Sequence, residues 1–507
     1  MTKYYGIDLG TTHSAIAFIN EIGVAAIIPN SDNERITPSV VFFESKDGIL
    51  VGKIAKAWKE TAPDRVVDFV KRQMSDKDWM FAVDGENYNP ERISSYILSR
   101  LANDANKTAG HEVQDVVITC PPYFGDFERQ RTRDAGEIAG LNVIAILDEP
   151  VAATINYFSE CADNKGKTIM VYDLGGGTFD ATVVKIGDDS EKNEICVICT
   201  DGTHSLGGHD WDQQIVEYLV QEFQSQTGSS ANPLDDPEGV AELWLLAEDV
   251  KKALSARESI TKRICWDGEK ATVELTREKF DEMTTHLLNM TIYFTDRALE
   301  MAREQGIAEI DTFLLVGGST RMLQVRDKLC EKYGLTPGKD LIDSGPDADE
   351  MVAKGAAKYA ERIIATHENN ATIGRAVASK SYGIQVRDIH GKVMVKNYIS
   401  KCMPLPVEVK DTFMASSDDT RELSLVIYAN NETTESSELD ICTELGEVNF
   451  VFPYKLVSGA TIDIRFTLTE YGHLRLFADT TLSVEGKFVP KGKFMPDGTL
   501  SENIFDW

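Results

Sequence analysis

The sequence predicts an α/β domain of two duplicated lobes over residues 1–365, followed by a small antiparallel β-sandwich over residues 382–490. Short apolar strands alternate with amphipathic helices in the first part, which is the pattern of α/β proteins. The stretch YGIDLGTTHSAIAFI (5–19) returns in weaker form as VYDLGGGTFDATVVKI (171–186), as a duplicated lobe would require. In the last part, every second residue is apolar over several stretches, which is typical of half-buried strands.

Two strand–helix pairs justify the α/β assignment of the first domain. DVVITC (115–120) predicts a buried strand, and the following FERQRTRDAGEIAG predicts an amphipathic helix that ends at Gly140. NVIAIL (142–147) predicts the next strand. EPVAATINYF then begins a helix with Pro150 in its first turn, where proline is tolerated because its missing N–H would have no helical partner.

The pattern of polar and apolar residues changes before the second domain. Residues 366–381 are polar, show no clear periodicity and predict a linker. Beyond them, ATIDIRFTLT places alternating apolar residues on one face of a strand, namely Ile462, Ile464, Phe466 and Leu468. EYGH then predicts a turn into a second alternating stretch, so a half-buried hairpin is expected. Residues 491–507 are predicted to form a tail.

The net charge of −30 argues against two classes of partner. An acidic surface repels nucleic-acid phosphates and anionic membranes, so neither is expected as a partner. The start of the chain shows no signal-peptide pattern, and no apolar run reaches the roughly 18 residues that span a bilayer. The eight cysteines are scattered through the chain, as is typical of reduced thiols. A cytoplasmic protein is therefore expected.

Three successive glycines in VYDLGGGTFD (171–180) need an explanation. A P-loop would end in G-K-S/T and a dinucleotide fingerprint would open a helix, whereas the β-branched ATVVKI that follows predicts a strand. An isolated glycine hairpin is most simply a turn. Here two matching hairpins are each led by an aspartate, Asp8 or Asp173. Glycines let N–H groups approach phosphate oxygens, and the aspartates require Mg²⁺ beside the phosphates, so a metal–nucleotide pair is predicted.

A third glycine pair points the same way. FLLVGGSTRMLQVRDKL (313–329) predicts a strand, then Gly317 and Gly318, then a helix. Two glycines at a helix start suit the close approach of a flat ring or a phosphate. An ordinary strand-to-helix turn explains this stretch equally well when it is taken alone.

With these stretches in view, the chain resembles the heat-shock-protein-seventy, or DnaK-type, chaperones, within the actin and sugar-kinase superfamily. The resemblance runs from residue 4 to about 485 and is carried by GIDLGTTHS, ITPSVVFF, VDFVKRQM, VVITCPPYFGDFERQRTRDAG, LDEPVAATINY, VYDLGGGTFDATVV, HSLGGHDWD, AEDVKKALS, LLVGGSTRM and ADEMVAKGAA. It implies a two-lobed, actin-like (ribonuclease H-like, duplicated) ATPase domain before the β-sandwich. It also implies slow, Mg²⁺-dependent hydrolysis of ATP to ADP and phosphate.

The resemblance assigns residues to ATP, Mg²⁺ and catalysis. The first phosphate hairpin would be Gly10, Thr11, Thr12 and His13, and the second Gly175, Gly176, Gly177 and Thr178. Mg²⁺ would be held, largely through its waters, by Asp8, Glu149 and Asp173, with K⁺ as a further candidate ion. Lys71, otherwise an ordinary helix lysine, would neutralise charge that develops on the γ-phosphoryl group. Asp173, Glu149 and Thr178 would orient the attacking water, and which of them takes the proton stays open.

The remaining assignments concern adenosine, interdomain coupling and peptide. One adenosine wall would be Glu248, Lys251, Lys252 and Ser255, and the other Gly317, Gly318, Ser319, Arg321 and Asp349, with Gly207 and Gly208 of HSLGGHDWD also at the nucleotide. Pro121 and Arg129 match a pair that relays the nucleotide state between domains. In the β-domain, Ile384, Leu423 and Leu425 match positions that line the peptide cleft, although a plain sandwich core explains them nearly as well.

Four departures from the family pattern carry expectations. Lys252 stands where arginine is usual, so weaker nucleotide binding is expected because an ammonium cannot stack on adenine. The linker stretch TIGRAV has only Ile373 and Val377 as large apolar residues, which predicts weaker coupling. Arg387 replaces an apolar arch residue, which argues against an enclosed apolar arch. The residues after 490 are too few for the family's helical lid, so a lidless member is expected.

These features favour an ATP-driven chaperone that binds unfolded or extended polypeptides, with a J-domain co-chaperone and a nucleotide-exchange factor as candidate partners. Within the family, the alternative is a nucleotide-sensing co-chaperone or regulatory member that binds ATP but hardly cycles. Lys71, Thr178 and the three acids argue for hydrolysis. A sugar kinase or an actin-like filament protein would share the nucleotide fold, but neither explains a β-sandwich after a linker.

Overall fold

The computed structural model describes residues 4–46, 48–110, 112–160, 166–187, 195–228, 232–343, 348–366, 377–387, 392–415, 417–469, 474–479, 483–485 and 487–490. The chain divides into two compact units, one of Met1–Pro122 with Phe127–Ile373 and the other of Tyr123–Asp126 with Gly374–Trp507. Most of the predicted linker, residues 367–376, and the whole predicted tail lie outside the described residues. Among the helices of the described ranges, none has the length and apolar character needed to cross a membrane.

The first unit contains two sheets with the same strand order. In the first sheet the order is β3 (Ala25–Ile27), β2 (His13–Ile19), β1 (Tyr5–Asp8), β10 (Asp115–Cys120) and β11 (Asn142–Asp148), with β4 (Thr37–Pro38) also paired to β2. In the second it is β14 (Ile195–Thr203), β13 (Phe179–Ile186), β12 (Thr168–Leu174), β17 (Thr312–Val316) and β18 (Leu341–Asp343). In both, the first three strands are antiparallel and the last three parallel. This correspondence agrees with the repeat seen in the sequence.

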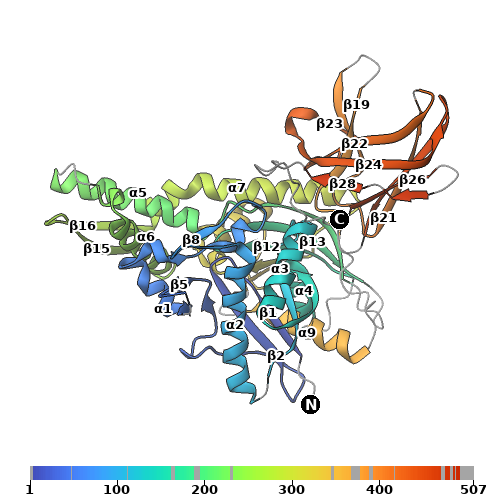
Figure 1. Ribbon diagram of the computed structural model, residues 1–507. Coiled ribbons are helices and arrows are strands. Elements are labelled where there is room, and N and C mark those ends of the chain that lie inside the picture. Colours follow the sequence, from blue (N-terminus) through green and yellow to red (C-terminus); the bar gives the residue numbers. More distant parts are fainter. Residues whose placement is uncertain are drawn as a thin grey trace. The chain divides into compact units, whose positions relative to one another are not determined.

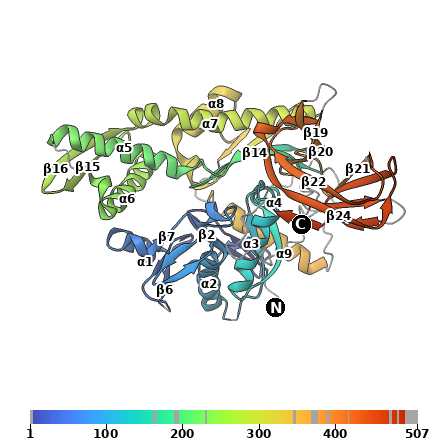
Figure 2. The same ribbon diagram turned by 45° about the horizontal axis from the view of Figure 1, so that its top comes forward.

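Helices cover these sheets, so the α/β prediction is confirmed. The helices are α1 (Lys53–Ala57), α2 (Pro90–Ala109), α3 (Asp126–Ile138), α4 (Glu149–Glu160), α5 (Gly208–Thr227), α6 (Pro237–Leu254), α7 (Arg277–Glu304), α8 (Leu323–Tyr333) and α9 (Met351–Thr366). Helix α9 packs closely on β1 and β2 because its contacting residues, Ala353 and Ala357, are small. Both ribbon views show α7 as one long helix (Figures 1 and 2).

Small strands and 3₁₀ turns complete the first unit. Two small sheets are formed by β5 (Val41–Phe43), β6 (Ile49–Val51) and β7 (Val66–Val67), and by β8 (Phe81–Val83) with β9 (Glu86–Tyr88). The 3₁₀ turns are η1 (Trp58–Glu60), η2 (Pro63–Arg65), η3 (Val70–Gln73), η4 (Pro233–Asp235) and η5 (Gly318–Arg321). The hairpin of β15 (Ser259–Trp266) and β16 (Glu269–Thr276) packs beside α5 and α6 (Figure 1).

The predicted elements around residue 120 occur where expected. DVVITC is the buried strand β10, and NVIAIL with one further residue is β11. Helix α3 stops at Ile138, two residues before Gly140, which has a φ of 83° that favours glycine. Helix α4 begins at Glu149 with Pro150 in its first turn. Local patterns were sufficient here, since β10 is a continuous run of residues buried on both faces of the sheet and α4 has proline in its first turn.

The second unit consists of two antiparallel sheets. The larger sheet has the order β23 (Ser436–Glu438), β20 (Val393–Ile399), β19 (Ser381–Arg387), β22 (Thr420–Asn430), β24 (Thr443–Leu456) and β28 (Lys487–Pro490). The smaller has the order β21 (Val407–Met414), β25 (Thr461–Leu468), β26 (Leu474–Asp479) and β27 (Ser483–Glu485). Another 3₁₀ turn, η7, spans Leu439–Ile441.

Both sheets of the second unit contribute to one apolar core. Ile384 and Phe450 come from the larger sheet, and Ile464 and Phe466 from the smaller. The ring of Phe466 also stacks on that of Tyr398 with centroids 4.2 Å apart. The alternating face predicted for β25 is confirmed, since its four apolar residues are all buried. The predicted hairpin is the antiparallel pair β25–β26.

Candidate functional site

A cavity of about 780 Å³ lies in the first unit, within the size range of small-molecule sites. The turn between β1 and β2 and the turn between β12 and β13 both contribute to its wall. Twenty predicted site residues line it: Asp8, Gly10, Thr11, Thr12, His13, Lys71, Glu149, Asp173, Gly175, Gly176, Thr178, Glu248, Lys251, Lys252, Ser255, Gly317, Gly318, Ser319, Arg321 and Asp349. The fold therefore brings together residues from opposite ends of a chain segment of more than 300 positions.

The two glycine hairpins face each other so closely that side chains of one occupy the space beside the glycines of the other. A Cβ atom on Gly176 would lie 2.2 Å from Thr12 Cγ2, and one on Gly177 would lie 2.5 Å from Thr11 Cγ2. A real Cβ could not occupy either position without displacing the opposite hairpin. Glycine is therefore required at these positions by the approach of the other hairpin.

Other elements hold the carbonyl groups of the second hairpin. Gly175 O accepts from Gly208 N at 3.0 Å and from Ser319 Oγ at 2.9 Å. Gly176 O accepts from His209 N at 2.8 Å, and Gly177 O from Arg72 Nε at 2.9 Å. In a planar trans peptide, the N–H of the following residue points the opposite way. The next three N–H groups are thus oriented away from these donors, as an anion-binding turn requires.

Buried acidic side chains and one buried lysine form the polar centre of the cavity. Lys71 Nζ lies 2.5 Å from Glu149 Oε1, with both side chains less than a tenth exposed. Burial alone would lower the pKa of Lys71, but the carboxylates of Glu149 and Asp8 outweigh burial and raise it. Burial and Glu149 raise the pKa of Asp8 to about 7. Burial, Glu149 and Asp8 raise the pKa of Asp173 well above its ordinary value.

Asp180 belongs to the same acidic cluster and was missed in the sequence. It pairs with Asp173 across the β12–β13 hairpin, and its Oδ1 is buried with no hydrogen-bond partner among the described residues. Burial, then the charges of Asp173 and Glu149, raise the pKa of Asp180 well above its ordinary value. The signal that could have found it is the second aspartate of DLGGGTFD, which the strand register places opposite the first.

This donor set fits a hydrated divalent cation. Asp8, Glu149 and Asp173 supply three carboxylates against the single ammonium of Lys71, so a further positive charge would offset their repulsion. Within the described ranges, no group of three or more His, Cys, Asp or Glu side chains is placed to hold a metal ion directly. An ion here would be held through its own water molecules, as Mg²⁺ commonly is.

One wall of the cavity comes from α6. Glu248 binds two ammonium groups, that of Lys56 on α1 and that of Lys252 at 2.6 Å. Burial acts to raise the pKa of Glu248, but these two ammonium groups outweigh it and lower the pKa. Lys251 donates to Gly208 O at 2.8 Å and to Asp212 Oδ2 at 2.7 Å, which fastens α6 to the start of α5. Lys56 was missed because nothing local in KIAKAW marks it.

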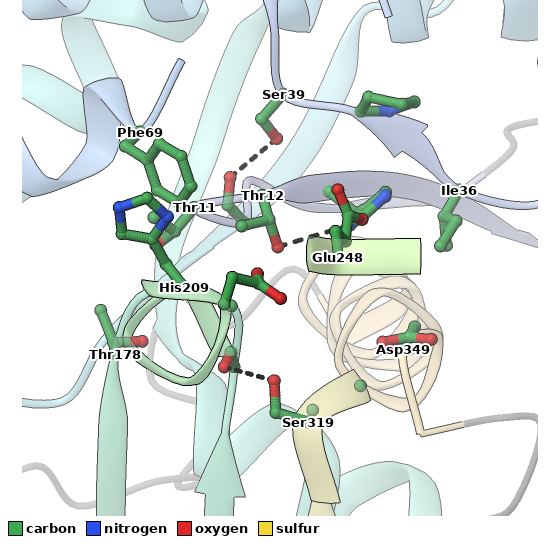
Figure 3. Close-up of a pocket in the computed structure, with 18 of the residues that line it drawn as sticks. Thr11, Thr12, Ile36, Ser39, Phe69, Thr178, His209, Glu248, Ser319 and Asp349 are labelled. Carbon is green, nitrogen blue, oxygen red and sulfur yellow. Dashed lines mark hydrogen bonds between the residues drawn. The ribbon is translucent and has the colours of Figure 1, made fainter. Parts of the chain in front are cut away.

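The opposite wall comes from the turn after β17. Gly317 has a φ of 85°, in the region that favours glycine, and a Cβ there would lie 2.4 Å from Leu174 O. Arg321 forms an ion pair of 2.8 Å with Asp349. Figure 3 shows Asp349 and Glu248 at one side of the cavity and Phe69 and His209 at the other. The two predicted walls therefore line the same cavity.

Three aromatic residues line the cavity, although the sequence did not indicate them. The ring of His209 on α5 stacks on Trp244 of α6 at 4.1 Å and lies 4.3 Å from the ring of Phe69. Burial and the nearby Arg72 lower the pKa of His209 to about 4, so this ring is neutral at pH 7. His13 is also neutral, since burial and the charges of Lys252 and Lys56 lower its pKa to about 4.

Some predicted residues lie outside the cavity lining. Gly177, Gly207 and Gly208 are absent from it. Gly177 lies in the second hairpin against Thr11, and Gly207 packs on that hairpin so closely that a Cβ there would lie 2.4 Å from Gly177 N. Arg129 forms an ion pair of 2.5 Å with Asp148, which precedes Glu149. Pro121 is buried at the end of β10.

The structure places the predicted peptide residues at different depths of the second unit. Ile384 is 3% exposed and belongs to the apolar core. Leu423 and Leu425 on β22 are partly exposed and pack against that core. Arg387, at the end of β19, is exposed. Leu423 and Leu425 are thus the two whose side chains reach the surface of the unit.

Comparison with known proteins gives consistent matches over this site. A family model described as Hsp70 protein matches residues 4–80 and 72–451. The chain is also similar to the chaperone protein DnaK of Thermotoga petrophila, of Thermotoga sp. strain RQ2 and of Thermotoga maritima. Each is 35% identical over 432 residues, which is 83% of this chain and 70% of the relative. The matched residues include every residue that lines the cavity.

Proposed function

This chain belongs to the Hsp70 family of ATP-dependent molecular chaperones, and we propose that the cavity of its first unit is where it binds and hydrolyses ATP with Mg²⁺. The observation that carries the proposal is the pair of interlocked glycine hairpins beside the cluster of Asp8, Glu149, Asp173 and Lys71. Hairpin amides suit phosphates, and the acids suit a hydrated cation. The glycine hairpins by themselves would be explained by tight turns, and the acidic cluster by itself would not indicate a nucleotide.

The roles of individual residues follow from their positions in the cavity. The two hairpins would hold the phosphates, and the walls at Glu248 and Asp349 would enclose adenosine. Lys71, charged and held by Glu149, would meet negative charge that develops on the γ-phosphoryl group. Asp173, Glu149 and Thr178 would orient the attacking water. Bound Mg²⁺, with K⁺ as a further candidate ion, would add charge neutralisation of the phosphates.

The domain boundaries complete this proposal. Residues 1–365 would be the actin-like ATPase domain, 366–381 the linker and 382–490 a β-sandwich that binds peptide. Two antiparallel sheets around one apolar core support the sandwich. Partly exposed Leu423 and Leu425 support a peptide surface, with buried Ile384 as their packing support.

The proposed partners are extended polypeptides, a J-domain co-chaperone and a nucleotide-exchange factor. The relay role of Pro121 and Arg129 is supported by the ion pair of Arg129 with Asp148, because Asp148 adjoins Glu149 in the proposed catalytic cluster. A change at the γ-phosphate would alter the contacts of Glu149, which is the residue next to Asp148 of this ion pair. The cytoplasmic location stays a prediction.

Single-turnover hydrolysis of ATP, with protein in excess, tests the proposed site. We expect slow conversion to ADP with Mg²⁺, none with a chelator, and faster conversion when a short apolar peptide is added. Tight ATP binding with Mg²⁺ but no ADP formation would instead identify a nucleotide sensor that hardly cycles. Failure to bind ATP at all would contradict the proposed site.

The adenosine wall gives a smaller prediction at Lys252, whose side chain is 62% exposed and 2.6 Å from Glu248. Lys252→Arg is expected to tighten ADP binding a few-fold, because a guanidinium can stack on adenine for about 0.5–1 kcal/mol at equal charge. Calorimetric titration measures the change. As a matched control, Lys262→Arg alters a lysine paired with Asp249 outside the cavity lining and should leave the affinity unchanged. Equal or weaker binding by Lys252→Arg would remove stacking from this wall.

A further inference from the structure

Lys71 lies on a very short element that needs support from outside. The 3₁₀ turn η3 spans only Val70–Gln73, and Phe69 before it has a φ of 52°, which is uncommon for an aromatic residue. A 3₁₀ turn of this length has few internal hydrogen bonds to hold it. The direction of the Lys71 side chain therefore depends on the contacts that fix the two ends of this segment.

One side of η3 is fixed to the second hairpin. Arg72 donates to Gly177 O from Nε at 2.9 Å and from its terminal nitrogen at 2.6 Å. The same terminal nitrogen lies 3.2 Å from Asp210 Oδ2. This tie links the residue after Lys71 directly to the proposed phosphate site.

The other side is fixed by Arg131, a buried arginine on α3. One of its terminal nitrogens donates to Met74 O at 3.0 Å and to Asp76 O at 2.9 Å. Its Nε lies 2.9 Å from Glu91 Oε2, an ionic contact without hydrogen-bond geometry, and its guanidinium carbon lies 4.8 Å from the Phe127 ring centre. Only 7% of the residue is exposed. A planar guanidinium can satisfy these directions at once, which an ammonium cannot.

Helix α3 thereby reaches both partners of the buried ion pair. Arg131 holds the carbonyls three and five positions after Lys71. Two residues earlier on the helix, Arg129 holds Asp148, the neighbour of Glu149. Lys71 Nζ lies 2.5 Å from Glu149 Oε1. The segments that carry these two residues are therefore each held by an arginine of the same helix.

We propose that Arg131 is a positioning residue for Lys71, so that it sets the rate of phosphoryl transfer while contributing little to nucleotide affinity. This inference rests on the proposed role of Lys71. Arg131 is not among the residues that line the cavity, so it would act on the reaction through the backbone of the segment that carries Lys71. A displacement of the lysine by about 1 Å can cost about a hundredfold in rate, whereas the bulk of the binding contacts lies on other elements.

The test compares five variants of the full chain by single-turnover ATP hydrolysis and by ATP affinity. Arg131→Met is combined with Glu91→Gln, so that no buried carboxylate is left without its cation, and Glu91→Gln alone is measured beside it. Arg131→Lys keeps the charge. Arg133→Met is the matched control, because that arginine of α3 donates to Val143 O and not to the Lys71 segment. Lys71→Met tests the premise.

The double variant is expected to hydrolyse ATP at least about tenfold more slowly, with its ATP affinity within about twofold of the parent. Arg131→Lys should recover part of the rate, and Glu91→Gln and Arg133→Met should stay near the parent. Parental turnover in the double variant, beside an inactive Lys71→Met, would overturn the role of Arg131. Equal losses of affinity and rate would also overturn it, as a purely structural effect. Normal turnover in Lys71→Met would instead refute the proposed catalytic site on which this inference depends.

Discussion

Lys71→Met should lose ATP turnover by about a hundredfold or more while ATP binding stays measurable. The ammonium of Lys71 is buried, 2.5 Å from Glu149, and its raised pKa keeps it charged at neutral pH. A fixed charge aimed at developing negative charge contributes mainly to the transition state, and removal of one such group typically costs about 10²–10³ in rate. Nucleotide binding and single-turnover hydrolysis, measured on the same preparation, separate the two effects.

Folding of this variant needs a check, because removal of one partner from a buried ion pair typically costs about 3–5 kcal/mol. The measurements therefore belong well below its melting temperature. Lys59→Met is the matched control, since Lys59 also lines the cavity and is paired with Asp68, away from the acidic cluster. We expect Lys59→Met to turn over near the parental rate. Turnover by Lys71→Met at that rate would remove Lys71 from the mechanism.

Gly176→Ala is expected to reduce ATP turnover by about a hundredfold, whereas Gly175→Ala changes it by less than about threefold. An added methyl at Gly176 would lie 2.2 Å from Thr12 Cγ2 and 2.7 Å from Thr12 Cβ. Rotation of the threonine side chain cannot relieve the second contact, so the hairpins must separate. Separation by about 1 Å would displace the amide groups that are proposed to hold the phosphates.

Gly175 makes a close control because it is the adjacent glycine of the same hairpin. An added methyl there would meet Thr178 O and Thr178 Oγ1 at 3.6 Å, which is ordinary van der Waals contact. Steady-state turnover and thermal melting of both variants would be compared with the parent. Similar activity of the two variants would mean that close approach of the hairpins does not matter for the reaction.

Local patterns in the sequence were enough to predict several elements. The strand β10, the strand β11 and the start of α4 follow from apolar runs and from Pro150. The repeat around Asp8 and Asp173 predicted a duplicated lobe, and the structure has two sheets of corresponding strand order. These features depend on residues close together in the chain, since a strand or helix is selected by its own periodicity.

The motifs also predicted which residues gather at the cavity, because each motif assigns several neighbouring residues to the site at once. Twenty predicted positions line one cavity, among them Gly10, Gly175 and Gly176 of the two hairpins. Three positions predicted to bind the nucleotide, Gly177, Gly207 and Gly208, do not line it, although they belong to the same motifs. A motif identifies a turn as a whole, but it does not say which of its residues faces the cavity.

The sequence by itself determined the α/β pattern, the repeat and the residue types of the site. Only the tertiary structure decided which partners those residues have: Lys71 with Glu149 across 78 positions, Gly176 against Thr12, and Arg131 on the carbonyls after Lys71. Asp180 and the His209–Trp244 stack emerged in the same way. The physical reason is that such contacts join elements far apart in the chain. Their distances depend on how whole helices and sheets pack, which no local pattern records.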